Sequence, residues 1–258
     1  MFKTDDGIIH MIYMGKTPDG IMRCFMACST DGIHFSPENV ADKTNVENRV
    51  APHELIALNN SEIAGVIEDK TADKSERYKM FISSYNGESL SVSDDVYVSE
   101  DLYSWKKKSG AFWAYGAEPL MSAVFDEKKK CYNLYIRPFW GIRHVGVSTT
   151  KDFMSLSPFE PCLQADSGDE PLSEVYGMKA FNYEGVYIGV VHMYRGHENS
   201  YGAKFHGGLL DTQLAYSYDG KYFRRSLREP FIGSKQSETA LGYETPTVWV
   251  SEVMKIAI

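Results

Sequence analysis

The stretch LLDTQLAYSYDGKYFRR, residues 209–225, reads as a β-strand, a tight Asp-Gly turn and an aromatic residue that opens a second strand. Similar phrases occur four times in the chain: MACSTDGIHF (26–35), VYVSEDLYSW (96–105), VGVSTTKDFMSL (145–156) and LAYSYDGKYF (214–223). We align the copies on Ser29, Ser99, Ser148 and Ser217, and the third copy has one extra residue before its Asp. Such repetition indicates a fold built from repeated units.

Each copy follows stretches rich in Tyr, Phe, Ile, Val and Met, the composition of half-buried strands. One such stretch lies directly before each copy, at residues 8–15, 77–85, 131–137 and 186–194. Polar turns introduce these stretches, and before the turns of the last three units lie further strand candidates at 61–67, 119–125 and 175–181. Each unit therefore has four strands, but the first unit lacks its first strand because only Met1–Lys3 precede the turn.

Four-stranded units of this spacing are typical of β-propeller blades. An incomplete fifth unit follows at residues 245–258. We predict an all-β fold, a five-bladed β-propeller of four-stranded antiparallel blades whose first and last blades are incomplete in this chain. The predicted single domain covers residues 1–258, with approximate blades at 1–50, 51–112, 113–166, 167–240 and 241–258. We expect the aromatic residues Phe35, Trp105 and Phe223 to pack between neighbouring blades. The alternative, a β-sandwich, explains the strands but not the repeated turn.

Composition excludes several classes of partner. The net charge is -8, which does not fit the basic surface that nucleic acids require. No apolar run reaches the roughly 20 residues that span a bilayer, and residues 1–6 do not read as a signal peptide, so we expect a cytoplasmic protein without membrane contact. The four cysteines match no metal-binding spacing and are expected to be reduced, structural thiols: Cys24, Cys28, Cys131 and Cys162.

Three stretches of the chain resemble a known superfamily: YNLYIRPFWGIRHVGVSTTKDF (132–153), EVYGMKAFNYEGVYIGVVHMYRG (174–196) and GGLLDTQLAYSYDGKYFRRSLREPFIG (207–233). They resemble the five-bladed propellers of glycoside hydrolase families 32 and 43, and especially related uncharacterised bacterial family-32-like proteins. The resemblance covers about residues 8–250. It implies a central funnel that binds a furanose or pyranose sugar between carboxylates from different blades. Such enzymes carry an acidic residue on the first strand of the first blade, whereas Asp5 and Asp6 lie in the turn after that position.

Strand direction selects the residues that face this funnel. In an antiparallel blade the start of the first strand, the end of the second and the start of the third meet on one face. The candidates near the starts of first strands are Glu62 (or Glu54), Glu118, Glu174 and Glu244. The candidates at the ends of second strands and the starts of third strands are Arg137, Arg143, His144, His192, Tyr194, Arg195 and Asp211.

The chemistry of glycoside cleavage suggests roles for two of these residues. One protonated carboxyl group must donate to the leaving oxygen while an ionised one attacks or activates water, at separations of roughly 5 Å or 6.5–9.5 Å. The resemblance implies that Glu174 is the acid, and we predict that Glu118 is the second carboxylate. Structural roles are the alternative for every candidate, such as an ion pair for Arg137 or Arg143 and a core position for His192.

The predicted function is a glycoside hydrolase that acts on a furanosyl unit or a short oligosaccharide. The alternative is a non-catalytic carbohydrate-binding propeller or a truncated remnant of such an enzyme, and a protein-interaction propeller is a third reading. No metal or other cofactor is expected, because the histidines at 192, 197 and 206 match no ligand spacing. Open blade edges would pair with strands of another copy, so we expect a homo-oligomer.

Overall fold

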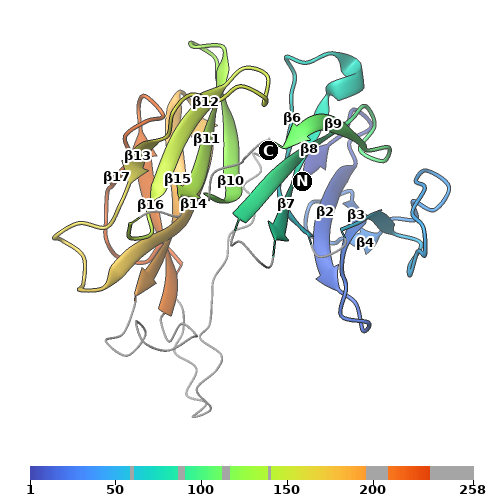
Figure 1. Cartoon of the computed structure of the whole chain (residues 1–258), viewed down its shortest axis with the longest axis horizontal. Helices are drawn as coiled ribbons and strands as arrows, with labels where there is room; N and C mark the ends of the chain where they lie inside the picture. Colours follow the sequence, from blue (N-terminus) through green and yellow to red (C-terminus); the bar gives the residue numbers. More distant parts are fainter. Residues whose placement is uncertain (59–60, 87–90, 112–116, 139–140, 196–208, 233–258) are drawn as a thin grey trace. The chain divides into compact units, whose positions relative to one another are not determined.

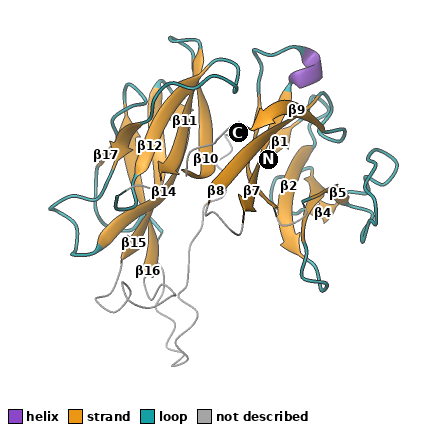
Figure 2. Ribbon diagram, viewed as in Figure 1, coloured by secondary structure: helices purple, strands orange, loops and turns teal. Residues whose placement is uncertain are grey.

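The computed structural model describes residues 1–58, 61–86, 91–111, 117–138, 141–195 and 209–232 (Figure 1). In these ranges the regular elements are antiparallel strands, apart from a single 3₁₀ turn, η1 (Lys74–Glu76), drawn in purple in Figure 2. The predicted all-β class is therefore confirmed. The chain divides into two compact units, unit 1 (Met1–Gly116) and unit 2 (Ala117–Ile258), which are described in turn.

Unit 1 contains two sheets. The first has the order β1 (Phe2–Lys3), β2 (Ile9–Lys16), β3 (Met22–Ser29) and β4 (Ser36–Pro37), with β5 (Glu54–Ala57) also paired to β3. The second has the order β6 (Ser61–Glu68), β7 (Tyr78–Asn86), β8 (Ser91–Ser99) and β9 (Lys106–Ala111). The prediction that the first unit lacks its first strand was wrong in one respect, since Phe2 and Lys3 form a short strand on β2.

Unit 2 contains two four-stranded sheets. The first has the order β10 (Ala117–Asp126), β11 (Cys131–Pro138), β12 (Val145–Thr150) and β13 (Glu160–Leu163). The second has the order β14 (Ser173–Tyr183), β15 (Val186–Arg195), β16 (Leu209–Ser217) and β17 (Arg224–Arg225). The four sheets of the described chain follow the strand order predicted for a blade. The predicted fifth blade, 241–258, lies outside the described residues.

Each unit has its own hydrophobic core. In unit 1 the core includes Met26 from the first sheet and Met80 from the second, and both are fully buried. In unit 2 all eight residues of β11 are buried, as expected for a strand covered on both faces. Phe223, after β16, packs edge-to-face on Tyr135 of β11 with ring centroids 5.4 Å apart. This aromatic residue therefore packs between neighbouring sheets, as the sequence predicted.

The repeated phrase forms the turn after the third strand of each sheet. In the first copy the Ser29 hydroxyl donates to Asp31 Oδ1 over 2.9 Å. The Asp31 carboxylate in turn accepts the backbone N–H groups of Ile33 and His34, both at 2.8 Å. The same hydroxyl-to-Asp bond is present in the second and fourth copies, at 3.1 Å and 2.9 Å.

The third copy corrects the sequence alignment. Thr150, not Ser148, holds the turn, because its hydroxyl donates to Asp152 Oδ1 at 3.3 Å and accepts the N–H of Phe153 at 2.9 Å. Ser148 instead donates to the backbone carbonyl of Ser157 at 2.6 Å. The apparent extra residue arose because we aligned the wrong hydroxyl.

Irregular pairing near the start of the first strand is shared by three of the four sheets. The register of β14 shifts between Val175 and Gly177, so Tyr176 has no opposite residue on β15. Similar shifts occur in β6 between Ile63 and Gly65 and in β10 between Glu118 and Ser122. Bulges of this kind bend a strand and redirect its side chains, often beside functional sites.

Candidate functional site

Glu174 and Arg143 form the centre of the candidate site in unit 2. Glu174 lies near the start of β14, opposite Tyr194 of β15, and only 7% of its surface is exposed. Nη1 of Arg143 donates to Glu174 Oε2 at 2.6 Å, and the backbone N–H of Arg143 donates to Oε1 at 3.3 Å. The structure thus brings together two residues that the strand-end pattern selected independently.

Two tyrosine rings and a second arginine surround this ion pair. The Arg143 guanidinium lies 5.5 Å from the ring centroid of Tyr176 and 5.3 Å from that of Tyr194. Arg137 stacks more closely on Tyr176, at 4.1 Å, and its Nη1 donates to the Tyr176 carbonyl at 3.1 Å. Favourable contacts between guanidinium groups and aromatic faces therefore hold the site together.

Tyr176 was missed by sequence reasoning. It is the bulged residue of β14, and a bulge disturbs the regular alternation from which faces are inferred. One signal was present in the sequence, since Tyr176 stands two residues after Glu174 in a stretch already selected. Residues at that spacing share a face in a regular strand.

Glu118 lies in β10 with its Cα opposite that of Arg137 in β11. Farther along β10, Ser122 accepts the backbone N–H of Ala180 of β14 at 2.9 Å, so the first strands of the two sheets lie side by side. The backbones that carry Glu118 and Glu174 therefore belong to neighbouring first strands of one unit. The separation of their carboxyl groups stays a prediction.

The pair formed by Arg195 and Asp211 lies on the other face of the same sheet. Nε of Arg195 donates to Asp211 Oδ2 at 2.6 Å, and Glu170 pairs with Arg195 at 3.0 Å. Strand alternation points Arg195 away from the side of β15 that carries Tyr194. Asp211 Oδ1 is buried, and no donor to it is found among the described residues.

The two predicted histidines are buried. A ring nitrogen of His144 donates to the carbonyl of Ile142 at 2.8 Å. His192 is fully buried in β15, and this burial, aided by the charge of Lys179, lowers its pKa to about 4. His192 is therefore neutral near pH 7, which suits the core role that was its alternative reading.

The remaining predicted residues lie in unit 1 or outside the described residues. Glu62 lies in β6 of unit 1, opposite Ser83 and half-buried. Its alternative, Glu54, is fully buried and accepts a 2.8 Å hydrogen bond from Arg23 Nη1, which indicates a structural role. Glu244 lies outside the described residues, as do the histidines at 197 and 206.

Within the described ranges, no group of three or more His, Cys, Asp and Glu side chains is arranged to hold a metal ion. No described helix is long and apolar enough to cross a membrane.

The strand order of the four sheets is that of β-propeller blades, and unit 2 holds a buried carboxylate, Glu174, beside aromatic rings. Solved structures with the same fold support this assignment. One is a putative glycoside hydrolase from Bacteroides ovatus ATCC 8483, with 17% identity, TM-score 0.57, and coverage of 95% of this chain and 76% of that one.

Two further structures show the same likeness. An endo-1,4-β-xylanase from Bacteroides thetaiotaomicron VPI-5482 has 16% identity and TM-score 0.56, with 90% of this chain and 72% of that chain covered. An N-acetylgalactosamine deacetylase from F. plautii, solved with blood group B trisaccharide, has 12% identity and TM-score 0.53, with 90% and 72% covered. No protein-family model and no curated protein matches the sequence.

At these identities the likeness shows the fold. The fold that the resemblance implied is thereby confirmed, while membership of a glycoside hydrolase superfamily stays a prediction. Assignment to family 32 or 43 stays a prediction.

Proposed function

We propose that this protein is a glycosidase that uses the Glu174 site of unit 2 to cleave a furanosyl unit or a short oligosaccharide. One observation carries the proposal. Glu174 is a buried carboxylate at the start of an inner strand, held by Arg143 and flanked by two tyrosines. The fold likeness to glycoside hydrolases supports the same class of reaction.

The residues around Glu174 suit a sugar. The faces of Tyr176 and Tyr194 can pack on the C–H surface of a sugar ring. Arg137 and Arg143 offer guanidinium N–H groups, which are donors only and so suit the oxygens of hydroxyl groups. A mainly apolar lining with a few fixed polar groups is the usual composition of a small-ligand site.

In the proposed reaction Glu174 gives its proton to the glycosidic oxygen as the bond to the anomeric carbon breaks. Glu118 attacks that carbon, or removes a proton from the water that does. Arg143 pairs with Glu174 at 2.6 Å in the free protein, so a bound substrate must draw the guanidinium away before Glu174 can face the glycosidic oxygen. Arg143 would then bind a substrate oxygen.

A non-catalytic sugar-binding protein is the second candidate, and the same ion pair favours it. At 2.6 Å, Arg143 engages the carboxylate directly, which is the arrangement of a site that binds without proton transfer. Sugar hydroxyl groups would then bind to the arginines and tyrosines. This candidate predicts binding by the wild-type protein but no product.

The test is a screen of aryl glycosides and of fructose- and arabinose-containing oligosaccharides against three proteins. These are the wild type, Glu174→Gln and a matched control, Glu170→Gln, whose side chain is 70% exposed on the same unit. Loss of a general acid should lower kcat/KM by about 10²- to 10⁴-fold in Glu174→Gln alone. Equal activity in all three proteins would remove Glu174 as the acid, and binding without turnover in the wild type would favour the second candidate.

A further inference from the structure

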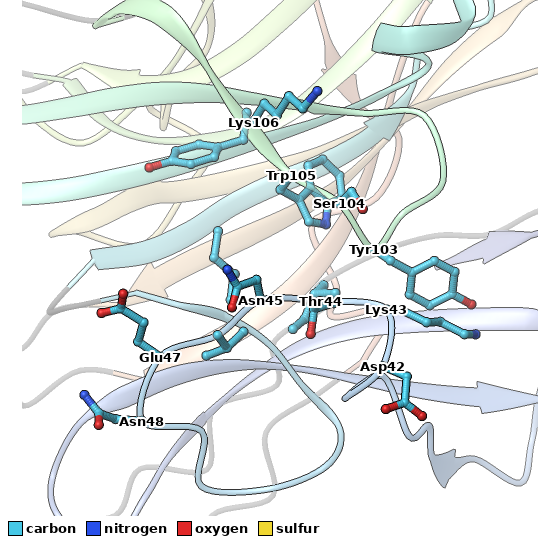
Figure 3. A pocket seen from close by; sticks show the side chains of 14 residues that line it. Asp42, Lys43, Thr44, Asn45, Glu47, Asn48, Tyr103, Ser104, Trp105 and Lys106 are labelled. Carbon is cyan, nitrogen blue, oxygen red and sulfur yellow. The ribbon is translucent and has the colours of Figure 1, made fainter.

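A groove in unit 1, remote in sequence from Glu174, has the properties of a ligand site (Figure 3). Its volume is about 910 Å³, at the upper end of the roughly 300–1,000 Å³ of small-molecule sites. One wall is the loop between β4 and β5, and the other is the turn between β8 and β9. None of the funnel-facing candidates selected from the sequence lines it.

The loop wall is long and fixed. Residues 38–53 connect β4 to β5, well beyond the usual connection of about 4–6 residues, and long loops without regular structure are often functional. Arg49 Nη2 donates to the carbonyl and the hydroxyl of Thr44 at 2.9 Å and 2.6 Å. Val40 is fully buried, and its carbonyl accepts the N–H groups of Lys43 and Thr44. The loop is thereby organised before any ligand binds, which lowers the entropy cost of binding.

The opposite wall presents two fixed aromatic rings. Trp105 packs partly against the core of unit 1, and its Nε1–H donates to the Leu102 carbonyl at 2.8 Å. The Tyr103 hydroxyl donates to Glu38 at 2.6 Å, and the Lys43 ammonium lies 4.1 Å from the centre of the Tyr103 ring. Burial and the bond to Glu38 raise the pKa of Tyr103 to about 12, so it stays a phenol at neutral pH.

The polar groups of the groove favour a neutral ligand. Its charged side chains balance, with Asp42 and Glu47 against Lys43 and Lys106. Asn45 belongs to the exposed part of the loop, and its amide can both donate and accept hydrogen bonds, as sugar hydroxyl groups require. Figure 3 shows Trp105 and Tyr103 on one side and Asn45 and Lys43 on the loop facing them.

We infer that this groove is a second carbohydrate-binding site, which holds a neutral oligosaccharide with one sugar ring against Trp105. The groove itself is defined by residues of unit 1 alone. The choice of a sugar over another neutral polar ligand rests on the proposed function. We assign the groove a binding role, which is to hold an oligosaccharide without cleaving it.

The test follows the Trp105 indole N–H signal by NMR while cellohexaose, xylohexaose or mannohexaose is added to the full chain. Trp105→Phe assigns the signal. We expect a saturable shift of the Trp105 signal with at least one oligosaccharide. Binding should be about tenfold weaker in Asn45→Ala. Because Asn45 is exposed, this substitution should leave the fold intact. The matched control is Tyr222→Ala, an exposed aromatic in the corresponding turn of unit 2, which should bind normally.

The outcomes separate this inference from the proposed function. Glu174→Gln should keep the Trp105 shift even if hydrolysis is lost. A shift in a wild-type protein that hydrolyses nothing would support the groove and oppose the glycosidase. Absence of any saturable shift at millimolar concentrations of all three sugars, in a folded protein, would overturn the inference.

Discussion

Gly220 shows how a single position fixes the turn of the fourth sheet. Its φ is +72°, and a Cβ there would lie 2.5 Å from the Asn133 amide nitrogen and 3.0 Å from the Tyr187 ring. Gly185 has a similar φ of +83°, but a Cβ there would meet nothing within 4 Å. Alanine substitutions at these two glycines therefore separate the cost of a left-handed backbone conformation from the cost of crowding by the added methyl group.

We expect Gly185→Ala to lower the free energy of unfolding by about 1 kcal/mol, the cost of a left-handed non-glycine residue. Gly220→Ala should lower the free energy of unfolding by about 2 kcal/mol or more, because the methyl group must also displace buried neighbours. Denaturant unfolding of both variants checks this prediction. Equal losses would mean that the Asn133 side chain moves aside freely.

His192 should make stability depend on pH. Its folded-state pKa is about 4 and its ordinary value is 6.5, so between these values the unfolded chain binds more protons than the folded one. Above about pH 6.5 the neutral His192 ring contributes up to roughly 3 kcal/mol to the free energy of unfolding. This contribution is lost as the pH falls to 4. Unfolding of His192→Gln should depend less on pH over this window. If the unfolding free energies of the wild type and His192→Gln change with pH in the same way, the assignment of His192 as a buried neutral ring is contradicted.

At the scale of elements, the repeated turn depends on one carboxylate. Asp219 accepts the Ser217 hydroxyl at 2.9 Å and the N–H groups of Lys221 and Tyr222 at 2.8 Å and 3.0 Å. We expect Asp219→Ala to cost about 1–3 kcal/mol of unfolding free energy, since it removes three hydrogen bonds to an ionised group. Asp219→Asn, which keeps one acceptor oxygen, should cost less. A neutral Asp219→Ala in thermal unfolding would show that the turn forms without this side chain.

The sequence predicted the turn well but not all of its chemistry. In the first and fourth copies the residue after the Asp is a glycine with a positive φ, Gly32 and Gly220. In the second and third copies the same conformation is adopted by Leu102 and Phe153, with φ of 71° and 60°. Both side chains are almost fully buried, so burial of a large apolar group offsets the backbone strain there.

The strands themselves were predictable because hydrophobic alternation reports which residues lie on a half-buried surface. Two strands, β1 and β5, could not be predicted in this way. The short pairing of β1 rests on Phe2, which the core of unit 1 buries, and no pattern of two residues can signal a strand. The pairing of β5 with β3 joins segments far apart in sequence, which local propensity does not encode.

At the scale of the whole molecule, strand direction was sufficient to bring Glu174 and Arg143 together, because the ends of adjacent strands meet on one face. It could not reveal Tyr176 on a bulge or the groove beside Trp105, which depends on the long loop after β4. The fifth blade and the single-domain organisation stay predictions.

Oligomeric state provides a further prediction at this scale. We propose that blade edges pair between copies, so that the protein forms a homodimer at micromolar concentration. Size-exclusion chromatography with light scattering measures the mass directly, against 29.2 kDa for one chain. A clean monomer over a hundredfold range of concentration would remove this proposal without affecting the Glu174 site.

The most direct test of the proposed glycosidase is a crystal structure of the wild-type protein that measures the distance between the carboxyl groups of Glu118 and Glu174. We expect a separation of about 5 Å for a retaining enzyme or about 6.5–9.5 Å for an inverting one. A separation beyond about 12 Å lies outside both mechanisms and would contradict the assignment of these two glutamates as the catalytic pair.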